Sequence, residues 1–238
     1  MGALSQTRVP VIAIDGPSAS GKGTVAARVA QALGFHYLDS GALYRLTTLA
    51  AIAAAIALED EPGLAEVART MQIRFGADGV RLAGRDVTEA LRTEEVSAAT
   101  SRVAAWPAVR AALLERQRGF RQLPGLVADG RDMGSIVFPD ADVKVFLSAS
   151  LETRAERRYK QLMEKGMYAK MADVVEELRR RDARDASRPV APLKHYPDAF
   201  FLDTSGLSVE QAVAQVLDWW RERASRRGRE TDRGGKSP

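Results

Sequence analysis

The sequence predicts an α/β fold in which helices cover both faces of a five-stranded parallel sheet, with an inserted antiparallel β hairpin and a helical lid. Short apolar runs alternate with segments of helical periodicity, which is the pattern of βα units in a parallel sheet. One segment alternates with period two around a turn, and two arginine-rich helical segments follow each other later in the chain. The chain has 238 residues with 45% apolar content, which is enough for one large domain with its own core.

The first βα unit carries a glycine-rich turn between its strand and its helix. Val9–Ile14 is an apolar run, and after Asp15 come Gly16, Pro17, Ser18, Ala19, Ser20, Gly21, Lys22, Gly23 and Thr24. Helical apolar spacing then continues to Gly34. In this context the turn predicts a phosphate-binding loop, because backbone N–H groups and the helix N-terminus attract phosphate while Lys22 adds a mobile positive charge. The alternative is a glycine-rich turn without a ligand.

The loop departs from the common phosphate-loop pattern at one position. Gly23, rather than Ser or Thr, follows Lys22, and Thr24 comes next. The hydroxyl that usually contacts Mg²⁺ is therefore missing from its normal place. We expect a metal held by Thr24, by waters or by the nucleotides themselves.

The second βα unit places an arginine at the carboxyl end of the sheet. Phe35–Leu38 reads as a short buried strand, Asp39-Ser40-Gly41 ends it, and the following helix carries Arg45. Because ligands of open α/β sheets bind outside the carboxyl ends of the strands, Arg45 is a candidate ligand residue. The alternative is an ordinary surface arginine.

The segment Met71–Val87 has the alternation of a β hairpin, with Asp78-Gly79 as its tight turn. A hairpin is antiparallel, so we expect it to form a small insertion, at about residues 60–95. A helix is predicted from about Thr93 to Ala105, and Pro107 begins another that ends near Leu123.

Leu126-Val127-Ala128-Asp129 has the form of the second phosphate-loop motif, a buried strand whose terminal Asp orients Mg²⁺. The alternative for Asp129 is an Asp that ends a strand before a turn. A fourth strand is expected at Val143–Leu147 and a fifth at Phe200–Leu202. Ser208 and Gln211 predict a capping box for the last helix.

Two helical segments between the fourth and fifth strands are rich in arginine. One spans Leu151–Lys165, and the other follows Asp173. We favour a lid at about residues 152–190 whose arginines close over a transferring phosphoryl group. The alternative is a solvated, ion-paired face, for which Glu176 and Arg180 are correctly spaced.

Composition excludes several classes of function. The chain has no cysteine, which excludes disulfides and thiolate metal sites, and its two histidines disfavour a histidine-rich metal site or a Ser-His-Asp triad. The apolar stretch Leu46–Leu58 is too short to span a bilayer, so we expect a cytoplasmic protein without a membrane partner.

The net charge of +4 comes from the C-terminal segment. Seven basic and three acidic residues lie within Arg221–Pro238. We expect a single domain at residues 9–223 and a disordered basic tail at 224–238. A solubilising tail is favoured, and contact between the tail and nucleic acid is the alternative.

Five sequence blocks together resemble the bacterial cytidylate kinases, a family of P-loop nucleoside monophosphate kinases. The blocks are GPSASGKGT, LDSGALYR, VADGRDMGS, VFPDADVKVFL and RDARDASR, and the match runs from about Val11 to Trp219. The resemblance implies a P-loop kinase that uses ATP and Mg²⁺ to phosphorylate CMP and dCMP to CDP and dCDP. It implies small-molecule partners and a monomer, whereas nucleic acid is not expected. The alternative is a kinase for UMP or another small metabolite on the same scaffold.

The resemblance also implies roles for individual residues. The loop from Gly16 to Thr24 would hold ATP with Arg157 and Arg158, and Thr24 and Asp129 would hold the metal, directly or through water. The residues that carry the catalytic charge would be Lys22, Arg131, Arg157 and Arg188. The acceptor nucleotide would be bound by Ser40, Arg45, Ser101, Arg110, Arg131, Asp132, Arg181, Asp185 and Arg188.

Within this acceptor set, Arg45 and Arg131 would hold the phosphate, and Ser101, Arg110 and Asp132 would read cytosine. Arg181 and Asp185 would contact the ribose, with Arg188 near the phosphates. A carboxylate at Asp132 accepts a hydrogen bond from the exocyclic amine of cytosine, whereas uracil offers only a carbonyl there.

Overall fold

The centre of the molecule is a sheet in which all neighbouring strands are parallel. The computed structural model describes residues 8–76 and 79–234, and its central sheet has five strands in the order β2-β6-β1-β7-β8. These strands are β1 (Val11–Asp15), β2 (His36–Asp39), β6 (Leu126–Gly130), β7 (Val143–Ser148) and β8 (Phe200–Asp203). The middle strand β1 is buried along its whole length, as expected for a strand covered on both faces. The predicted five-stranded parallel sheet is confirmed.

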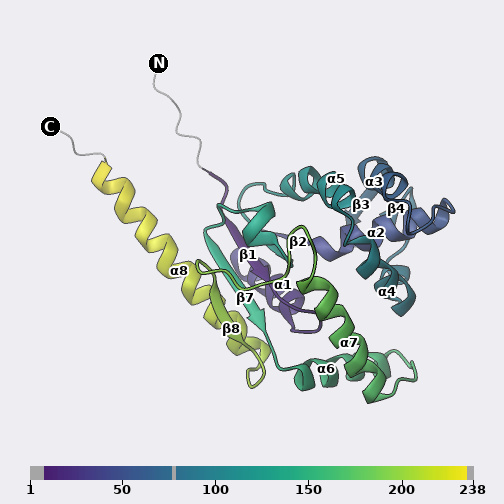
Figure 1. Cartoon of the computed structure of the whole chain (residues 1–238). Helices are drawn as coiled ribbons and strands as arrows, with labels where there is room; N and C mark the ends of the chain where they lie inside the picture. The colour runs from purple at the N-terminus through teal and green to yellow at the C-terminus, as the bar shows by residue number, and fades with distance from the viewer. Residues whose placement is uncertain (1–7, 77–78, 235–238) are drawn as a thin grey trace.

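Helices cover both faces of this sheet (Figure 1). Ile12 and Ile14 face α1 (Lys22–Leu33) and α8 (Val209–Gly234) on one side. Val11 and Ala13 point the other way, because successive strand residues alternate, and there they join a core with α2 (Ser40–Ala53), α5 (Pro107–Arg118) and the π-helical turn Met133–Val137. The result is the three-layer arrangement that the sequence predicts.

An antiparallel sheet forms the insertion. It follows α3 (Glu61–Thr70) and consists of β3 (Ile73–Gly76), β4 (Gly79–Leu82) and β5 (Arg85–Asp86) in that order. The predicted hairpin is thus confirmed, and the short third strand extends it. Gly79 begins β4 with a φ of 121°, which favours glycine, and Asp78 of the predicted turn lies outside the described residues. The next helix, α4 (Glu94–Val103), packs against α2.

Two arginine-rich helices form a separate layer beyond the carboxyl end of β7 (Figure 1). They are α6 (Leu151–Glu164), which Ser150 caps by accepting a hydrogen bond from the Thr153 amide, and α7 (Met171–Ala186). The pair shares a small core of its own, formed by Ala155, Leu162, Val174 and Leu178. Both helices fall within the proposed lid, residues 152–190.

Helix α8 extends into residues 224–238, the segment for which the sequence predicts a disordered basic tail. Helix α8 continues to Gly234, and only 235–238 lie outside the described residues. Its start follows the predicted capping box, in which the Ser208 amide donates to Gln211 and the Gln211 amide donates to Ser208. The reason for the continuation is local, because Arg, Glu and Ala are good helix formers and extending an existing helix needs no new nucleus.

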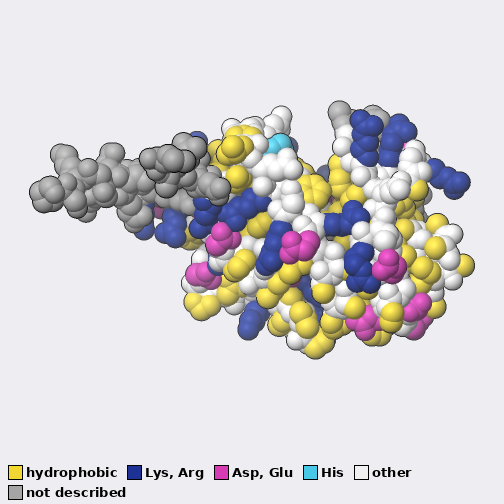
Figure 2. Space-filling view, turned by 90° about the horizontal axis from the view of Figure 1, so that it is seen from above, with side chains coloured by type: hydrophobic (Ala, Val, Ile, Leu, Met, Phe, Trp, Pro, Cys, Tyr) yellow, Lys and Arg dark blue, Asp and Glu magenta, His cyan; other side chains and the backbone are white. Residues whose placement is uncertain are grey.

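On the face shown in Figure 2, Lys and Arg side chains are interspersed with acidic and apolar ones. Among residues 8–76 and 79–234, we find no helix whose length and apolar character would suit it to crossing a membrane.

Candidate functional site

The phosphate loop connects the carboxyl end of β1 to the N-terminus of α1. Gly21 adopts a left-handed conformation with a φ of 92° at the N-cap of α1, and no side chain caps this helix. Gly16 packs directly on β7, where an added Cβ would lie 2.0 Å from the Leu147 carbonyl oxygen. The Nζ of Lys22 donates to the Pro17 carbonyl oxygen at 3.1 Å. This geometry suits phosphate, because the uncapped helix end and the lysine both offer donors.

The loop separates two hollows. The first, here called the central hollow, has a volume of about 210 Å³ and includes Ser18 and Lys22 in its wall. The second, called the outer hollow, has a volume of about 400 Å³ and lies between the loop, α6 and the start of α8. Ala19, Ser20, Gly21 and Thr24 line the outer hollow. One loop therefore borders two separate spaces, and Lys22 lines the first of them.

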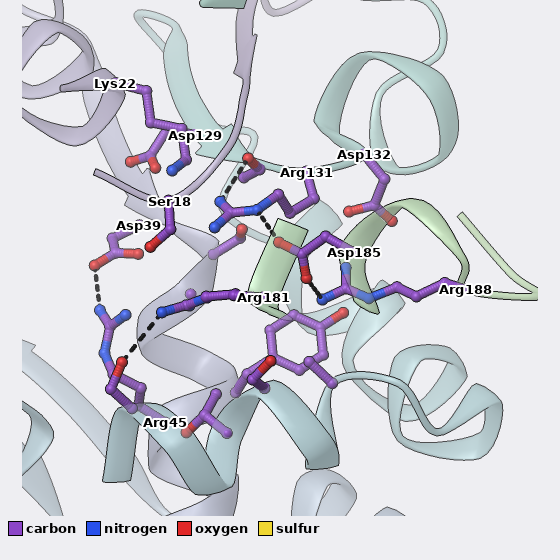
Figure 3. A pocket seen from close by; sticks show the side chains of 18 of the residues that line it. Ser18, Lys22, Asp39, Arg45, Asp129, Arg131, Asp132, Arg181, Asp185 and Arg188 are labelled. Atoms are coloured by element: carbon purple, nitrogen blue, oxygen red, sulfur yellow. Dashed lines mark hydrogen bonds and ion pairs between the residues drawn. The ribbon is translucent and has the colours of Figure 1, made fainter. Parts of the chain in front are cut away.

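Every residue predicted to bind the acceptor lines the central hollow (Figure 3). They come from α2, α4, α5, the end of β6 and α7, and these elements converge on the carboxyl edge of the sheet. The residues are Ser40, Arg45, Ser101, Arg110, Arg131, Asp132, Arg181, Asp185 and Arg188. Lys22 and Asp129 lie in the same wall.

Carboxylates hold the arginines of the central hollow. Asp185, 1% exposed, accepts from Arg131 Nε at 2.7 Å and also pairs with Arg188. Asp39 pairs with Arg45 at 2.5 Å. Such pairs orient the guanidinium groups before any ligand arrives, which lowers the ordering cost of binding.

Arg110 and Asp132 form a further ion pair, in which both side chains are almost fully buried. Arg110 also donates to the Ala104 carbonyl at 3.0 Å and lies over the ring of Tyr44, 5.6 Å from its centroid. Two of the three predicted cytosine readers, Arg110 and Asp132, are thus neighbours with fixed orientations.

Burial changes the acidity of the groups beside the loop. Removal from water, together with the charge of Arg131, lowers the pKa of Lys22 to about 7. Burial and the nearby Asp39 carboxylate raise the pKa of Asp129 to about 6. Burial alone would raise the pKa of Asp185, but Arg131 and Arg188 outweigh it and hold that pKa below its usual range. An anionic ligand would favour the charged form of Lys22 further, because an added opposite charge raises the pKa of an ammonium group.

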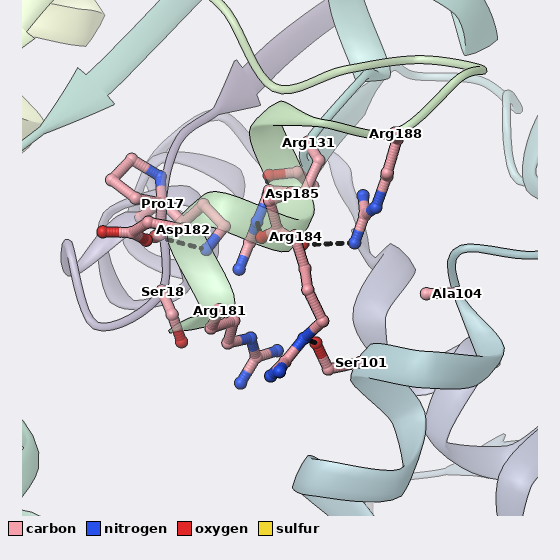
Figure 4. Close-up of polar contacts among 12 residues, drawn as sticks. Pro17, Ser18, Ser101, Ala104, Arg131, Arg181, Asp182, Arg184, Asp185 and Arg188 are labelled. Carbon is pink, nitrogen blue, oxygen red and sulfur yellow. Dashed lines mark hydrogen bonds and ion pairs between the residues drawn. The ribbon is translucent and has the colours of Figure 1, made fainter. Parts of the chain in front are cut away.

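The proposed lid touches α4 across the mouth of the central hollow. Arg158 pairs with Glu94, and the Lys165 ammonium donates at 3.0 Å to the carbonyl of Arg92, in the 3₁₀ turn just before α4. Arg181 donates to Ser97 at 3.1 Å, and Arg184 donates to Ser101 at 3.0 Å (Figure 4). We call these four contacts the lid–α4 interface. Four of the residues involved, Ser97, Ser101, Arg158 and Arg181, also line the central hollow.

Comparison with known proteins decides the family. The family described as Cytidylate kinase matches residues 12–235. The chain belongs to the cytidylate kinase family. It is 58% identical to the cytidylate kinase of Chromobacterium violaceum over 90% of this chain and 97% of that protein. It is 59% identical to the cytidylate kinase of Bordetella bronchiseptica over 89% of this chain and 95% of that protein. The resemblance seen in the sequence is confirmed, and so is the enzyme class, a nucleotide kinase.

Among solved structures, an uncharacterized protein from Eubacterium ventriosum aligns with 88% of this chain and 97% of its own, with a TM-score of 0.50. The two sequences are 11% identical, so this likeness concerns the fold alone.

The cytidylate kinase site divides the two predicted lid arginines. Arg157 lines the outer hollow and donates to the Ser20 carbonyl at 3.0 Å and to the Thr204 carbonyl at 2.6 Å. Arg158 instead lines the central hollow and reaches Glu94. The prediction grouped both with ATP, but consecutive helix residues point about 100° apart and here face different spaces.

The two predicted metal ligands are also divided. Asp129 lines the central hollow beside Lys22, whereas Thr24 is exposed and lines the outer hollow. Oxygen donors suit Mg²⁺, and a second carboxylate, Asp39, lines the same wall as Asp129. In the part of the chain that the structure describes, no group of three or more His, Cys, Asp or Glu side chains is placed so that it could hold a metal ion.

Several residues of the site were missed by sequence reasoning. Tyr37 donates to Asp129 at 2.7 Å, and Arg154 joins Asp182 of α7 to the Ser18 carbonyl of the phosphate loop. Asp15 accepts from the Met133 and Gly134 amides, and so fixes the turn after β6. Asp39 had a recognisable signal, because an Asp before a helix is a common N-cap, and its side chain accepts from Ala42. Tyr37, Arg154 and Asp15 make contacts between segments that lie far apart in the sequence, so no local pattern displays them.

Proposed function

We propose that this member of the cytidylate kinase family transfers the γ-phosphoryl group of ATP to CMP and dCMP, giving ADP with CDP and dCDP. ATP would lie along the phosphate loop with its nucleoside toward the outer hollow, and the acceptor would fill the central hollow. The observation that carries the proposal is the position of Lys22, in the wall of the one hollow that all predicted acceptor residues line.

The chemistry that this arrangement favours needs no general base. An oxygen of the acceptor phosphate, already ionised, forms the new bond to the γ-phosphorus while the bond to the β–γ bridging oxygen breaks and ADP departs. Lys22, Arg131 and Arg188 would neutralise the negative charge around the transferring group. Arg157 would hold the donor side, where it already contacts the loop. The catalytic contribution is positioning and charge, not proton transfer.

Mg²⁺, when bound, supplies charge neutralisation at the β- and γ-phosphates. Asp129 is the better supported ligand, through water, because it lies beside Lys22 in the central hollow. Thr24 would act on the donor side alone, consistent with its place in the outer hollow.

Recognition of cytosine would depend on Asp132 and Arg110. The carboxylate of Asp132 would accept from the exocyclic amine, and Arg110 would offer donors to the carbonyl and ring nitrogen of the base. Uracil places a carbonyl opposite Asp132, which leaves two acceptors facing each other. A monomeric state and a cytoplasmic location are parts of this proposal as well.

The test is coupled ADP release with CMP, dCMP, UMP, AMP and shikimate in parallel, each with Mg²⁺ and with EDTA. We expect Mg²⁺-dependent turnover of CMP and dCMP, with UMP far behind. Preferred turnover of UMP or of shikimate would favour the alternative kinase on the same scaffold. Turnover that is unchanged in EDTA would contradict the metal requirement.

A further inference from the structure

The Tyr37 hydroxyl lies close to the place that the hydroxyl of a Ser or Thr at position 23 would reach. Gly23 stands where most phosphate loops carry a Ser or Thr whose hydroxyl contacts Mg²⁺. An added Cβ at Gly23 would lie 3.6 Å from the Tyr37 hydroxyl oxygen and 3.9 Å from Asp129 Oδ2. A serine hydroxyl lies one bond beyond that Cβ. A serine at position 23 could therefore reach the same small region that the Tyr37 hydroxyl already occupies.

The Tyr37 hydroxyl arrives there from the opposite direction. Tyr37 lies on β2, the neighbour of β6, and the pairing of β2 with β6 sets Asp39 beside Asp129. From this strand the Tyr37 side chain spans to the start of α1 and donates to Asp129 Oδ2 at 2.7 Å. The hydrogen bond fixes one carboxylate oxygen of the residue that we propose as the metal's partner through water.

The hydroxyl, and not the ring, carries this contact. The ring of Tyr37 is 37% exposed and borders a shallow surface hollow with Phe75 and Phe120 of the insertion and its flank. A phenylalanine would make the same ring contacts, so packing gives no reason for a hydroxyl that points at Asp129.

We propose that Tyr37 is a positioning residue that supplies the hydroxyl missing at position 23 and orients the Asp129 carboxylate for the Mg²⁺–nucleotide complex. This inference rests on the proposed function, because it assumes that Asp129 acts toward Mg²⁺. It adds a residue outside the phosphate loop to the group that holds the nucleotide.

The chain offers a direct complementation test. Gly23 lies in the first turn of α1 with a φ outside the left-handed region, and its added Cβ meets only ordinary contacts, so Gly23→Ser is compatible with the backbone. The variants are Tyr37→Phe, Gly23→Ser combined with Tyr37→Phe, and Tyr168→Phe as the control. Tyr168 is 85% exposed, so this control removes a hydroxyl at a surface position.

The readout is the dissociation constant of a non-hydrolysable ATP analogue, measured by titration calorimetry with Mg²⁺ and with EDTA. In Tyr37→Phe we expect binding with Mg²⁺ to weaken about 10-fold, as for other residues that orient metal ligands, while binding in EDTA is unchanged. Adding Gly23→Ser should recover most of the loss, and Tyr168→Phe should match the parent chain.

Three results would overturn the inference. These are equal affinity of Tyr37→Phe and the parent chain in Mg²⁺, an equal loss in Mg²⁺ and EDTA, and failure of Gly23→Ser to restore binding. Measurements on the parent chain distinguish a failure of this inference from a failure of the proposed function. If its own affinity for the analogue does not depend on Mg²⁺, the proposed metal site fails and the inference fails with it.

Discussion

Arg158 of the lid helix α6 forms an ion pair with Glu94 at the start of α4, so two segments 64 residues apart meet at the mouth of the central hollow. The lid–α4 interface joins the proposed lid directly to the part of the molecule that carries acceptor residues. Opening of the lid therefore has to separate these contacts, and loss of one of them should favour the open form.

Glu94→Gln is expected to loosen the lid without removing any residue of the proposed catalytic group. Because the pair is partly exposed, its loss should change the opening equilibrium by a factor of about 2–5. Hydrogen exchange measured by mass spectrometry should show faster exchange in α6 and α7. Glu176→Gln, which breaks an exposed pair with Arg180 inside α7, is the control and should leave exchange near the parent rate. Unchanged exchange in both variants would mean that the pair does not restrain the lid.

Lys22→Ala is expected to abolish turnover while leaving the fold intact. The lysine supplies the mobile positive charge of the phosphate loop, and loss of one such stabilising group costs at least ~100-fold in rate. Burial lowers the pKa of its ammonium, so removing that charge should leave the unfolding temperature of the alanine variant no lower than that of the parent. Coupled ADP release and thermal unfolding by circular dichroism measure the two effects. Near-normal activity would contradict the proposed mechanism.

Asp132→Asn should weaken discrimination between CMP and UMP and should also destabilise the chain. The asparagine presents an amide that can donate to a uracil carbonyl, whereas it leaves the buried Arg110 without a full counter-charge. Removal of one partner from a buried ion pair costs about 3–5 kcal/mol. Ratios of kcat/KM for CMP and UMP test the first effect, and urea unfolding tests the second. A variant that keeps the parent's preference for CMP would exclude Asp132 as the base reader.

Asp15 should make the free energy of unfolding fall as pH rises from about 4 to about 6. Burial raises the pKa of Asp15 from 3.8 to about 6, although the Met133, Gly134 and Tyr196 donors oppose the change. Between these values the native state holds a proton that the unfolded state has lost, so the native state is favoured at the acid end. The expected loss is on the order of 3 kcal/mol.

Urea unfolding at a series of pH values tests this slope. Asp15→Asn should make the slope shallower, because an amide does not titrate, while Asp129, whose pKa burial also raises to about 6, keeps its own contribution. Asp140→Asn is the control, since Arg121 and Arg8 lower the pKa of Asp140 and its removal leaves the falling slope in place. If the free energy of unfolding falls with pH equally in the parent and in Asp15→Asn, titration of groups other than Asp15 causes the fall.

Local patterns were sufficient to predict most of the fold. The strands of the central sheet, the inserted hairpin and the capping box at Ser208 depend on short-range spacing, which a single sequence displays. For residues 224–234, composition suggests disorder whereas helix propensity favours continuation of α8. A charged segment of this kind is ambiguous without knowledge of the helix that precedes it.

The candidate site was predictable where a residue lies within a recognisable motif. Arg45, Arg131 and Asp132 lie in such blocks, and all of them line the central hollow. Tyr37 and Arg154 depend on which strands and helices become neighbours, and no local pattern carries that information. The separation of Arg157 from Arg158 likewise depends on how α6 sits between the two hollows.

The course of helix α8 also determines where a fusion partner or an immobilising tag can be joined to the protein. Beyond Trp220 it continues for about 20 Å, and in Figure 1 its end points away from α6 and α7. A fusion partner or an immobilising tag joined to this end would start well clear of α6 and α7, the helices of the proposed lid. Tethering there should leave the catalytic cycle undisturbed, whereas a tether on α6 or α7 would restrain it.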